Sequence, residues 1–342
     1  MSNYILPPEW TEQSGVQLTW PHENTDWNYM LDEVTECYIN VAREIAKREK
    51  LIIVTPEPEH VKAVIESKVN MENVTIVECN SNDTWARDHG GITVIDTENG
   101  NYVITDFGFN GWGQKFEATL DNEITFNCYK KELFKANYRN MNHFILEGGS
   151  IEADGNGSLM TTTRCLMSKF RNPSYSKEEI EELLKESFGV NNIVWIDNGY
   201  LAGDDTDSHI DTLARYCPNN TIAYVKCNDE NDEHYTELKA MEEELINAKN
   251  SEGNPYNLIA LPMADEIIFD GERLPASYAN FLIVNGAVLM PTYSQPENDK
   301  MAIEAISKAF PGYEVVGIDC VALIKQHGSL HCITMQYPEG VL

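Results

Sequence analysis

Short apolar runs and longer amphipathic stretches alternate along the whole chain. The apolar runs have the length of β-strands and cover residues 16–20, 51–55, 74–77, 102–105, 143–146, 193–195, 222–226, 281–290 and 333–336. Apolar residues at helical spacing predict helices at 28–49, 177–188, 233–249 and 299–310. The second of these helices follows a capping box, in which Ser176 and Glu179 satisfy each other's backbone N–H groups.

The predicted helices recur along the chain at similar intervals. Helix starts near residues 129, 177, 233 and 298 indicate a repeated strand–helix unit of ~50–60 residues. No proline- or serine-rich linker interrupts the sequence. The pattern therefore predicts an α/β protein in which residues 1–342 form a single domain.

One polar stretch, "GDDTDSHIDTLARY" at 203–216, departs from this background because it gathers four carboxylates and a histidine. In an extended strand successive side chains alternate between faces. Asp205, Asp207, His209 and Asp211 would then lie on one face, with apolar residues on the other. We expect this stretch to be a strand that presents acids and a base side by side.

Composition narrows the class of protein. The chain has 342 residues, 42% of them hydrophobic, and a net charge of −30 from 55 acidic and 25 basic residues. Such a surface disfavours nucleic acid and anionic membranes as partners and favours cations. The first residues lack the basic and apolar regions of a secretory signal, and no apolar stretch is long enough to span a bilayer.

Eight cysteines are scattered through the sequence without any CxxC pair. This spacing argues against a zinc cluster and against a disulfide scaffold. We therefore expect a cytoplasmic protein with buried, reduced thiols. Seven cysteines have the character of small buried hydrophobes, whereas Cys332 follows a glycine, a serine and a histidine at the start of an apolar run, as a nucleophile facing a cleft would.

Other polar residues allow both a catalytic and a structural interpretation. His209 could be a core histidine, but Asp211 two positions later would raise the pKa of its imidazole and suit it for proton transfer. Asp88, in "WARDHGG", and Glu147, before two glycines, could each be an ordinary salt-bridge or strand-end carboxylate.

Metal sites are the main alternative. His209 and Asp211 with His331 or His327 match the composition of a two-histidine, one-carboxylate iron site. Oxygenases of that kind that use a keto acid need a cationic anchor, and no Lys or Arg follows His327. A calcium loop fails because "DDTDSHID" lacks the central glycine and terminal glutamate. We therefore expect no metal.

Several long motifs in order resemble the agmatine deiminase family, within the guanidine-modifying pentein superfamily of arginine and peptidyl-arginine deiminases. They are "PPEW", "LTWPHENTDW", "WARDHGG", "DFGFNGWGQKF", "EGGSIEADGNGSLMTT", "RNPSYSKEEIEELL", "GDDTDSHIDTLARY", "PASYANFLIVNGAVLMPTY" and "LHCITMQ". The resemblance spans essentially the whole chain. It implies an α/β pentein fold, a five-bladed ββαβ propeller with pseudo-fivefold symmetry.

The resemblance also assigns roles to residues. It implies Cys332 as the nucleophile, His209 as general acid and base, Glu147 as the residue that orients the histidine, and Asp88 and Asp211 as the pair that grips the guanidinium. Further substrate contacts are implied for Asp205, Trp85, Trp112 and Asn280. For Asp205 to reach the same small substrate as Asp211, the segment "DDTDS" must turn back on itself, as its Asp and Ser content permits. The chain departs from the family at Ser208 and at residues 327–330, His-Gly-Ser-Leu, where glycines are common.

The implied activity is hydrolysis of agmatine to N-carbamoylputrescine and ammonia through an amidino-cysteine, without metal or organic cofactor. A guanidinium has only donors, so paired carboxylates would hold it in plane while a thiolate attacks its carbon. Agmatine is the expected partner, in a route to putrescine, and a homo-oligomer is left open. The alternatives are a peptidyl-arginine or other guanidino-compound deiminase, and an inactive polyamine-binding protein.

Overall fold

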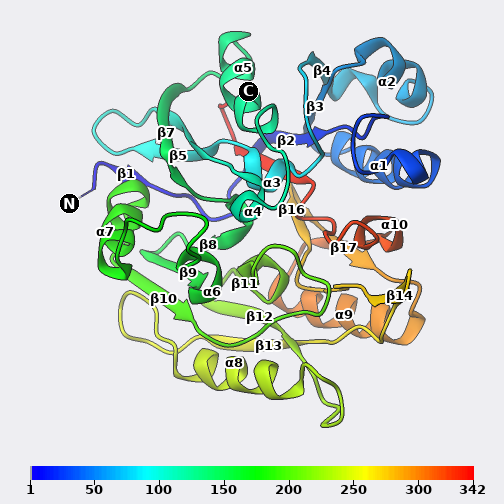
Figure 1. The fold of residues 1–342 in the computed structure, drawn as a ribbon. Coiled ribbons are helices and arrows are strands. Elements are labelled where there is room, and N and C mark those ends of the chain that lie inside the picture. Colours follow the sequence, from blue (N-terminus) through cyan, green and yellow to red (C-terminus); the bar gives the residue numbers. More distant parts are fainter. Residues whose placement is uncertain (1) are drawn as a thin grey trace.

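The computed structural model describes residues 2–342. Within this range the longer helices lie around the outside of the molecule and the strands lie inside them (Figure 1). No helix in the described range combines the length and the apolarity that crossing a membrane requires.

The strands form five small sheets that share one connection pattern, together with a two-stranded ribbon. In each sheet an antiparallel pair is followed by a helix, and the next strand then pairs in parallel with the second strand of the pair. A parallel neighbour needs such a crossover connection, which explains why a helix follows each hairpin. The predicted strand–helix repeat is confirmed in this form.

The first and second sheets lie next to each other in sequence. The first contains β19 (Thr334–Pro338), β2 (Gln13–Thr19), β3 (Lys50–Thr55) and β4 (Val74–Glu78), with helices α1 (Leu31–Ala46) and α2 (Pro58–Ile65). The second contains β1 (Tyr4–Ile5), β5 (Ile92–Asp96), β6 (Tyr102–Gly108) and β7 (Asn137–Ile145), with helix α5 (Ile124–Lys130). Because β19 and β2 pair, the chain's two ends meet in one sheet.

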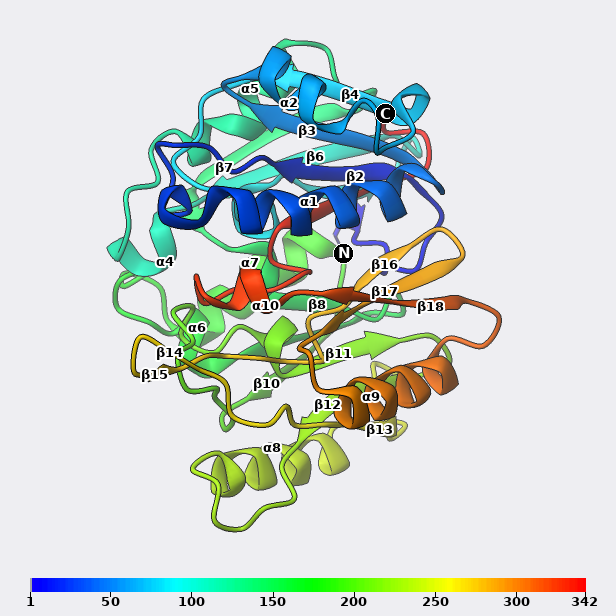
Figure 2. The same cartoon turned by 90° about the vertical axis from the view of Figure 1, so that its right-hand side faces the viewer.

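The other three sheets follow along the chain. Their strands and helices are β8 (Ile151–Ala153), β9 (Ser158–Thr162), β10 (Asn192–Ile196) and α7 (Lys177–Phe188); β11 (Ala214–Cys217), β12 (Thr221–Lys226), β13 (Asn257–Pro262) and α8 (Tyr235–Asn247); and β16 (Leu282–Val284), β17 (Ala287–Thr292), β18 (Glu314–Asp319) and α9 (Pro296–Ala309). The ribbon consists of β14 (Ile268–Phe269) and β15 (Glu272–Arg273). Figure 2 shows α8 and α9 along one outer side.

Short helices join these sheets. They are α3 (Ala86–His89), α4 (Gly111–Gln114), α6 (Thr163–Leu166) and α10 (Val321–Ile324), with 3-10 turns η1 (Asn28–Met30), η2 (Met71–Asn73), η3 (Asp121–Glu123), η4 (Gly148–Ser150) and η5 (Ile210–Thr212). Three of them, α3, η4 and η5, lie next to the residues that the sequence singled out for chemistry.

The four long helices predicted from apolar spacing are confirmed, with α1, α7, α8 and α9 ending within a few residues of the expected bounds. The expected helix start near 129 is wrong, because α5 ends at Lys130. The single strand expected at 281–290 is wrong as well. It is the hairpin β16–β17, which turns at Asn285 and Gly286, where the glycine adopts a φ of +73°.

The expected strand over 203–216 is also wrong except at its end, whereas the turn expected within "DDTDS" is confirmed. Only Ala214–Cys217 is a strand, and 203–208 is a folded loop followed by η5. Asp204 holds the loop in this shape, because its carboxylate accepts from Thr206 N at 3.1 Å and from Ser208 N at 2.7 Å. A short acidic side chain that bonds to backbone groups ahead of it favours a turn over a strand.

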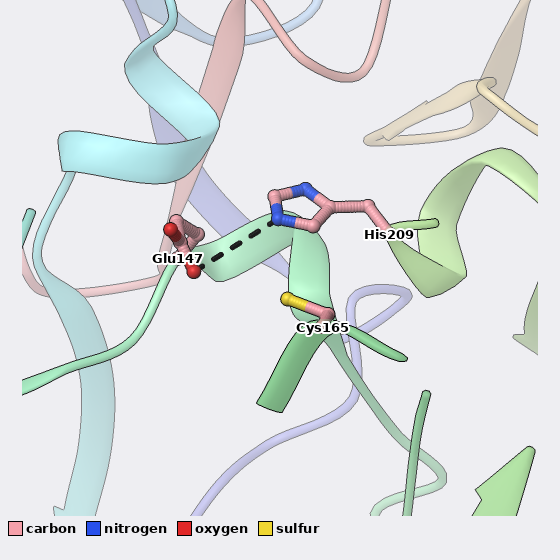
Figure 3. A group of neighbouring side chains, drawn as sticks. All are labelled: Glu147, Cys165 and His209. Atoms are coloured by element: carbon pink, nitrogen blue, oxygen red, sulfur yellow. Dashed lines mark ion pairs between the residues drawn. The ribbon is translucent and has the colours of Figure 1, made fainter. Parts of the chain in front are cut away.

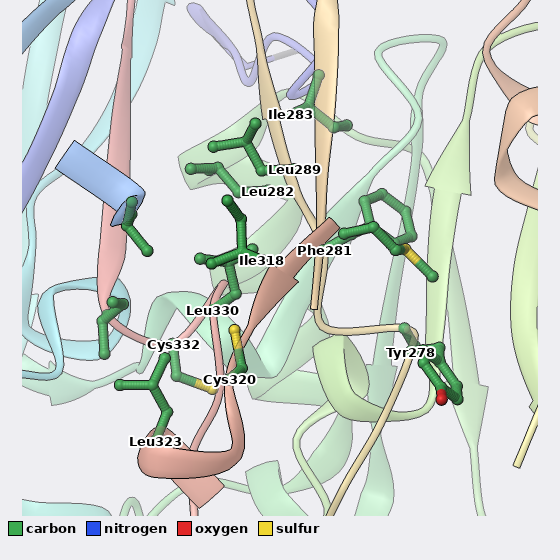
Figure 4. Close-up of a cluster of buried hydrophobic side chains, with 14 of the residues drawn as sticks. Tyr278, Phe281, Leu282, Ile283, Leu289, Ile318, Cys320, Leu323, Leu330 and Cys332 are labelled. Atoms are coloured by element: carbon green, nitrogen blue, oxygen red, sulfur yellow. The ribbon is translucent and has the colours of Figure 1, made fainter. Parts of the chain in front are cut away.

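Buried apolar side chains form two main clusters, one of which extends to the predicted nucleophile. Leu282 and Leu289 from the β16–β17 hairpin lie in the same buried group as Leu323, Leu330 and Cys332 (Figure 4). Cys332 is 4% exposed. The Cys332 side chain therefore packs against the apolar core on one side and faces the polar site on the other.

Candidate active site

Five of the predicted catalytic residues come together from separate segments of the chain. Asp88 lies in α3, Glu147 directly before η4, His209 directly before η5, Asp211 within η5, and Cys332 two residues before β19. All five side chains are buried. The fold thus brings together residues that are up to 244 positions apart in the sequence (Asp88 to Cys332).

Gly149 shows how tightly three of these groups converge. A Cβ atom added at this glycine would lie 2.7 Å from His209 Nδ1, 2.9 Å from Asp88 Oδ1 and 3.0 Å from Asp211 Oδ2. Any side chain there would collide with all three polar groups. The second of the two glycines after Glu147 is therefore explained by this close approach of three side chains. Only glycine leaves the space between His209 and the two carboxylates open.

Asp88 is held at both oxygens. Oδ1 accepts from the backbone N of Gly149 at 3.0 Å, and Oδ2 accepts from the indole Nε1 of Trp112 at 2.9 Å. Burial raises the pKa of Asp88 to about 6, with the nearby charge of Asp211 acting in the same direction and that of His209 against it. The carboxylate is thus fixed in orientation and is ionised at neutral pH.

His209 lies between two carboxylates, those of Asp88 and Glu147, and Figure 3 shows its ring directed toward Glu147. Its Nδ1 is 3.6 Å from Asp88 Oδ1 and its Nε2 is 3.9 Å from Glu147 Oε2. Burial opposes protonation, but the charges of Asp88, Cys165 and Glu147 outweigh it and raise the pKa of His209 to about 10. Neither ring nitrogen has a hydrogen-bond partner among residues 2–342, so both remain able to bond to a ligand.

Glu147 is neutralised by an arginine that the sequence reasoning missed. Arg171 Nε lies 2.9 Å from both oxygens of Glu147. The same guanidinium donates from Nη1 to Asp207 at 2.5 Å and from Nη2 to the carbonyl of Thr206 at 2.9 Å. Arg171 therefore fastens Glu147 to the acidic loop at 203–208. Its signal in the sequence is the "RNP" motif, to which the sequence analysis gave no role.

Cys165 was also missed, since only Cys332 was singled out among the cysteines. Its thiol lies with Glu147 and His209 in a group whose ligand atoms are all within 4.8 Å of one another (Figure 3). The side chain is fully buried at the start of α6. Cys165 thus lies beside His209 together with Glu147.

Asp211 and Cys332 form the other half of the site. Cys332 Sγ lies 4.0 Å from Asp211 Oδ2. Burial opposes ionisation of Asp211, but the hydrogen bond from His331 and the charges of His331 and His209 outweigh it and lower the pKa of Asp211. Burial and the charges of Asp211 and Asp88 raise the pKa of Cys332 well above that of a free thiol, so Cys332 is protonated at neutral pH in this state.

Asn280 lies behind Cys332. Its Oδ1 is 3.4 Å from Cys332 Sγ and accepts from the backbone N of His331 at 2.9 Å and of Cys332 at 3.3 Å. The residue is fully buried and is not among the pocket-lining residues described below. Where a substrate contact was expected, the structure thus has a side chain that holds the segment carrying the thiol.

A pocket leads from this site to the surface. Its walls include the rings of Trp85, Trp112 and Phe116, and Cys332 and Asp88 lie at its inner end. Further out it is lined by acidic residues, namely Asp26, Asp83 and Asp205. Burial raises the pKa of Asp205, while the charge of His327 acts against this shift. The pocket therefore combines aromatic walls with carboxyl groups at its outer end.

Both departures from the family pattern lie at residues that shape this mouth. Ser208 and His327 adopt left-handed backbone conformations, with φ of 64° and 66°, in which a glycine would be unstrained. His327 Nδ1 also lies 2.7 Å from the carbonyl oxygen of Gly203, which joins the two loops. The next residue, Gly328, packs so closely on Trp85 that an added Cβ would lie 2.0 Å from the ring.

The metal alternatives receive little support from the geometry. Among residues 2–342, two clusters could hold an ion: Glu147, Cys165 and His209, and Glu9, Glu152 and His331. The first contains the carboxylate that Arg171 already pairs, and the second is paired with Arg215. The iron ligand set considered from sequence, His209 and Asp211 with His331 or His327, is not one of these clusters.

Comparison with known proteins matches the chain over nearly its whole length. The family model of the Porphyromonas-type peptidyl-arginine deiminases matches residues 5–338. The agmatine deiminase of Pseudomonas putida is 30% identical, over 99% of this chain and 96% of its own length. The chain belongs to the Porphyromonas-type peptidyl-arginine deiminase and agmatine deiminase family.

Solved structures agree with this assignment. A C. jejuni agmatine deiminase, a cysteine-to-serine variant with substrate bound, is 37% identical with a TM-score of 0.92, covering 99% of this chain and 97% of that one. A protein from Porphyromonas gingivalis, described provisionally as an arginine deiminase, is 48% identical with a TM-score of 0.93 and 99% coverage of both chains.

A more distant likeness concerns the fold alone. The DDAH of Pseudomonas aeruginosa is 13% identical with a TM-score of 0.50, covering 95% of this chain and all of that one. The expected mixed α/β fold of the pentein superfamily is therefore confirmed.

Proposed function

We propose that the protein hydrolyses agmatine to N-carbamoylputrescine and ammonia through a covalent amidino-cysteine intermediate at Cys332. The observation that carries this proposal is the convergence of a thiol, a protonated histidine and two carboxylates, of which Cys332 and Asp88 line an acidic pocket and His209 and Asp211 lie directly behind them. Relatives named agmatine deiminase at 30% and 37% identity support the same substrate.

The two carboxylates suit a guanidinium. This planar cation offers only donors, and an ionised carboxylate offers only acceptors, so opposed aspartates can hold it in its plane by charge-assisted bonds. Oδ1 of Asp211 is buried without a partner among residues 2–342, which leaves it free for a substrate N–H. Asp88 is fixed by Gly149 and Trp112 and retains further lone pairs. The guanidinium carbon then stays open to attack from above its plane.

Binding of the cation would activate the nucleophile. The negative charges of Asp211 and Asp88 contribute to the raised pKa of Cys332. A guanidinium between these carboxylates offsets their field, so the thiolate becomes more favourable when substrate is present. The reactive form of Cys332 is therefore produced mainly in the occupied site, and the free enzyme is protected from adventitious thiol chemistry.

His209 then serves both halves of the reaction. The Cys332 thiol loses its proton to solvent when agmatine binds, the thiolate adds to the guanidinium carbon, and protonated His209 gives a proton to the nitrogen that leaves as ammonia. The resulting neutral imidazole takes a proton from water, which attacks the amidino carbon and breaks the C–S bond. Glu147 and Asp88, on either side of the ring, stabilise its protonated form in both steps.

The rest of the pocket suits the remainder of agmatine. The four methylene groups of agmatine would lie against Trp85 and Trp112, and the ammonium of agmatine would reach the acidic mouth of the pocket at Asp205. Among the lining residues in the described part of the chain there is no lysine or arginine. A free arginine would place its α-carboxylate among Asp26, Asp83 and Asp205, which is electrostatically unfavourable. The pocket therefore favours agmatine over arginine.

The test is a substrate comparison. Ammonia and carbamoyl product are measured for agmatine, L-arginine and an arginine-containing peptide, each with and without EDTA. We expect kcat/KM for agmatine to be at least about 100-fold higher than for the other two substrates, because a well-placed ionic contact at each end of agmatine contributes a difference of this order. EDTA should not change this activity. Preference for arginine or the peptide would contradict the proposal, as would loss of activity with EDTA and its return with zinc or iron.

We propose in addition that the five sheets are arranged as the blades of a propeller with pseudo-fivefold symmetry and that 1–342 is one catalytic domain. Their shared connection pattern supports this. The eight cysteines, all buried and unpaired in the described range, support a reducing, cytoplasmic setting, in which the product would lead toward putrescine.

A further inference from the structure

His331 joins Asp211 to a group of buried charges behind the site. It is fully buried, precedes Cys332 in the chain, and its Nδ1 lies 2.7 Å from Asp211 Oδ2. An ionised carboxylate can only accept, so Nδ1 carries the hydrogen in this contact. Because Asp211 Oδ1 has no partner in the described part of the chain, His331 occupies one oxygen and leaves the other for a ligand.

The opposite edge of the His331 ring is held by the N-terminal segment. Nε2 lies 3.0 and 3.1 Å from the two oxygens of Glu9 and 3.0 Å from Arg215 Nη2. Nε2 therefore faces an acceptor and a donor together. A protonated Nε2 can donate to Glu9, and an unprotonated Nε2 can accept from Arg215. In both states the hydrogen on Nδ1 remains directed at Asp211.

Glu9 and Arg215 are themselves fixed. Arg215 Nη2 donates to Glu9 at 2.5 Å, and Arg87 Nη1 donates to Glu9 at 3.1 Å. Arg215 is fully buried, pairs with Glu152, and donates to the carbonyl oxygens of Ala279 and Phe281. The ring of His331 is thus held by an ion-pair network in which Glu9 is partly exposed, at 20%, and the arginines are buried, and which does not itself line the pocket at Cys332.

We propose that His331 is a positioning residue, which fixes the carboxylate of Asp211 through Oδ2 so that Oδ1 stays available to the guanidinium. This assignment rests on the proposed function, in which Asp211 grips agmatine. His331 does not touch the reacting atoms. Without its Nδ1 hydrogen, the buried Oδ2 would lose its partner and the carboxylate would be free to turn. A misplacement of about 1 Å in a substrate-holding group costs on the order of 100-fold in rate.

Two amide variants separate the two edges of the ring. In His331→Asn the side-chain N–H lies near the position of Nδ1 and can still donate to Asp211. In His331→Gln the N–H lies near the position of Nε2, where it reaches Glu9 instead. We expect His331→Asn to keep kcat/KM for agmatine within about threefold of wild type, and His331→Gln to lower it by about 10- to 100-fold.

Stability should not follow activity in this pair. His331→Gln keeps the contact with Glu9, so its urea unfolding midpoint should be at least as high as that of His331→Asn. A merely structural role for His331 would give activity and stability the same order. His234→Asn serves as the control, since His234 is a buried histidine whose Nδ1 lies 2.6 Å from Asp232, outside the site. It should leave kcat unchanged.

A second measurement keeps the network intact. In Cys332→Ser protein labelled with 15N-histidine, the Nδ1 hydrogen of His331 should resonate far downfield and shift when agmatine binds. Suppose that the wild-type protein turns over agmatine but the two amide variants are equally active or equally impaired. That result would overturn the positioning role alone, and so would a His331 resonance that does not move when agmatine is bound. Absence of agmatine turnover by the wild-type chain would instead overturn the proposed function and this role with it.

Discussion

Arg171 Nε lies 2.9 Å from both oxygens of Glu147, and both side chains are completely buried. The pair ties the carboxylate beside His209 to the loop that carries Asp207, since Arg171 Nη1 also donates to that residue. Burying two charges is costly, so removing one partner leaves the other unpaired in an apolar setting. The relationship makes Arg171 a support of both the fold and the site.

Replacing Arg171 should therefore be severe. We expect Arg171→Met to lower the free energy of unfolding by about 3–5 kcal/mol, as when one partner of a buried ion pair is removed, and to reduce agmatine turnover. Urea denaturation and activity measurements check both effects. Arg164→Met is the control, because Arg164 is half exposed and 4.0 Å from its partner Glu237, and it should change stability by about 0.5 kcal/mol or less. Equal effects of the two substitutions would contradict this role for Arg171.

Cys332→Ser should abolish turnover while agmatine still binds, because Asp88 and Asp211 remain in place. Isothermal titration calorimetry measures the binding, and ammonia release measures the turnover. Cys128→Ser is the matched control, since Cys128 is fully buried in the other apolar cluster and should cost stability only. Turnover by Cys332→Ser at a rate near that of wild type would remove the covalent mechanism.

The pH dependence follows from two shifted groups. Asp88 must be ionised to hold the cation, and burial raises its pKa to about 6. His209 must be protonated to release ammonia, and its pKa is raised to about 10. The profile of kcat/KM should thus fall below about pH 6 and above about pH 10. An alkaline limb near pH 6.5–7 would show that His209 has the pKa of an ordinary histidine.

The same shift affects stability, with a definite sign. The folded pKa of His209 lies above the value of about 6.5 in an unfolded chain, so the folded state binds the proton more tightly. The resulting stabilisation is fully present below about pH 6.5 and is lost as the pH rises toward 10. In His209→Gln, the fall in urea midpoint between pH 6.5 and 10 should be smaller than in wild type. An unchanged fall would assign it to other groups.

Cys165 should affect the pH at which activity falls on the alkaline side of the kcat/KM profile. Its thiol contributes to the raised pKa of His209. Cys165→Ala should therefore move the alkaline limb of the activity profile to lower pH, whereas Cys128→Ala, at an equally buried cysteine away from the site, should leave the limb in place. If both variants have the wild-type limb, Cys165 acts only in packing, which is what the sequence analysis expected of it.

Asp205 allows binding to be separated from chemistry. A charge-assisted contact to the distal ammonium is worth ~1.5–3 kcal/mol. Asp205→Asn should accordingly raise KM for agmatine by roughly tenfold to a hundredfold, with kcat less affected, the pattern of lost uniform binding. A simple alkylguanidine, which lacks the amine, should hardly respond. Equal losses for both substrates would show that Asp205 is structural or catalytic.

Local sequence signals explain which predictions from the sequence were correct. The helix at 177–188 begins at a capping box formed by Ser176 and Glu179 and ends before Gly189, which adopts the left-handed conformation typical of a helix end. The strand prediction for 203–216 was wrong because alternating acidic residues have the sequence pattern of a strand. In the structure Asp204 instead accepts hydrogen bonds from backbone N–H groups ahead of it and folds the loop.

Contacts between distant segments explain what the sequence reasoning missed. Arg171, Cys165 and His331 each meet the site through a partner that is 24, 44 or 120 positions away. A local motif such as "RNP" at Arg171 does not reveal which distant residue is the partner. Motif resemblance picked out the residues proposed for the chemistry, whereas the residues that hold them required the tertiary structure.

The most direct test is to detect the intermediate. The wild-type chain is mixed with agmatine, quenched in acid within one turnover and digested for mass spectrometry. We predict that the peptide containing Cys332 gains the mass of agmatine minus ammonia, and that the adduct disappears as N-carbamoylputrescine forms. Turnover of agmatine without any adduct on Cys332, or with the adduct on another cysteine, would contradict the account.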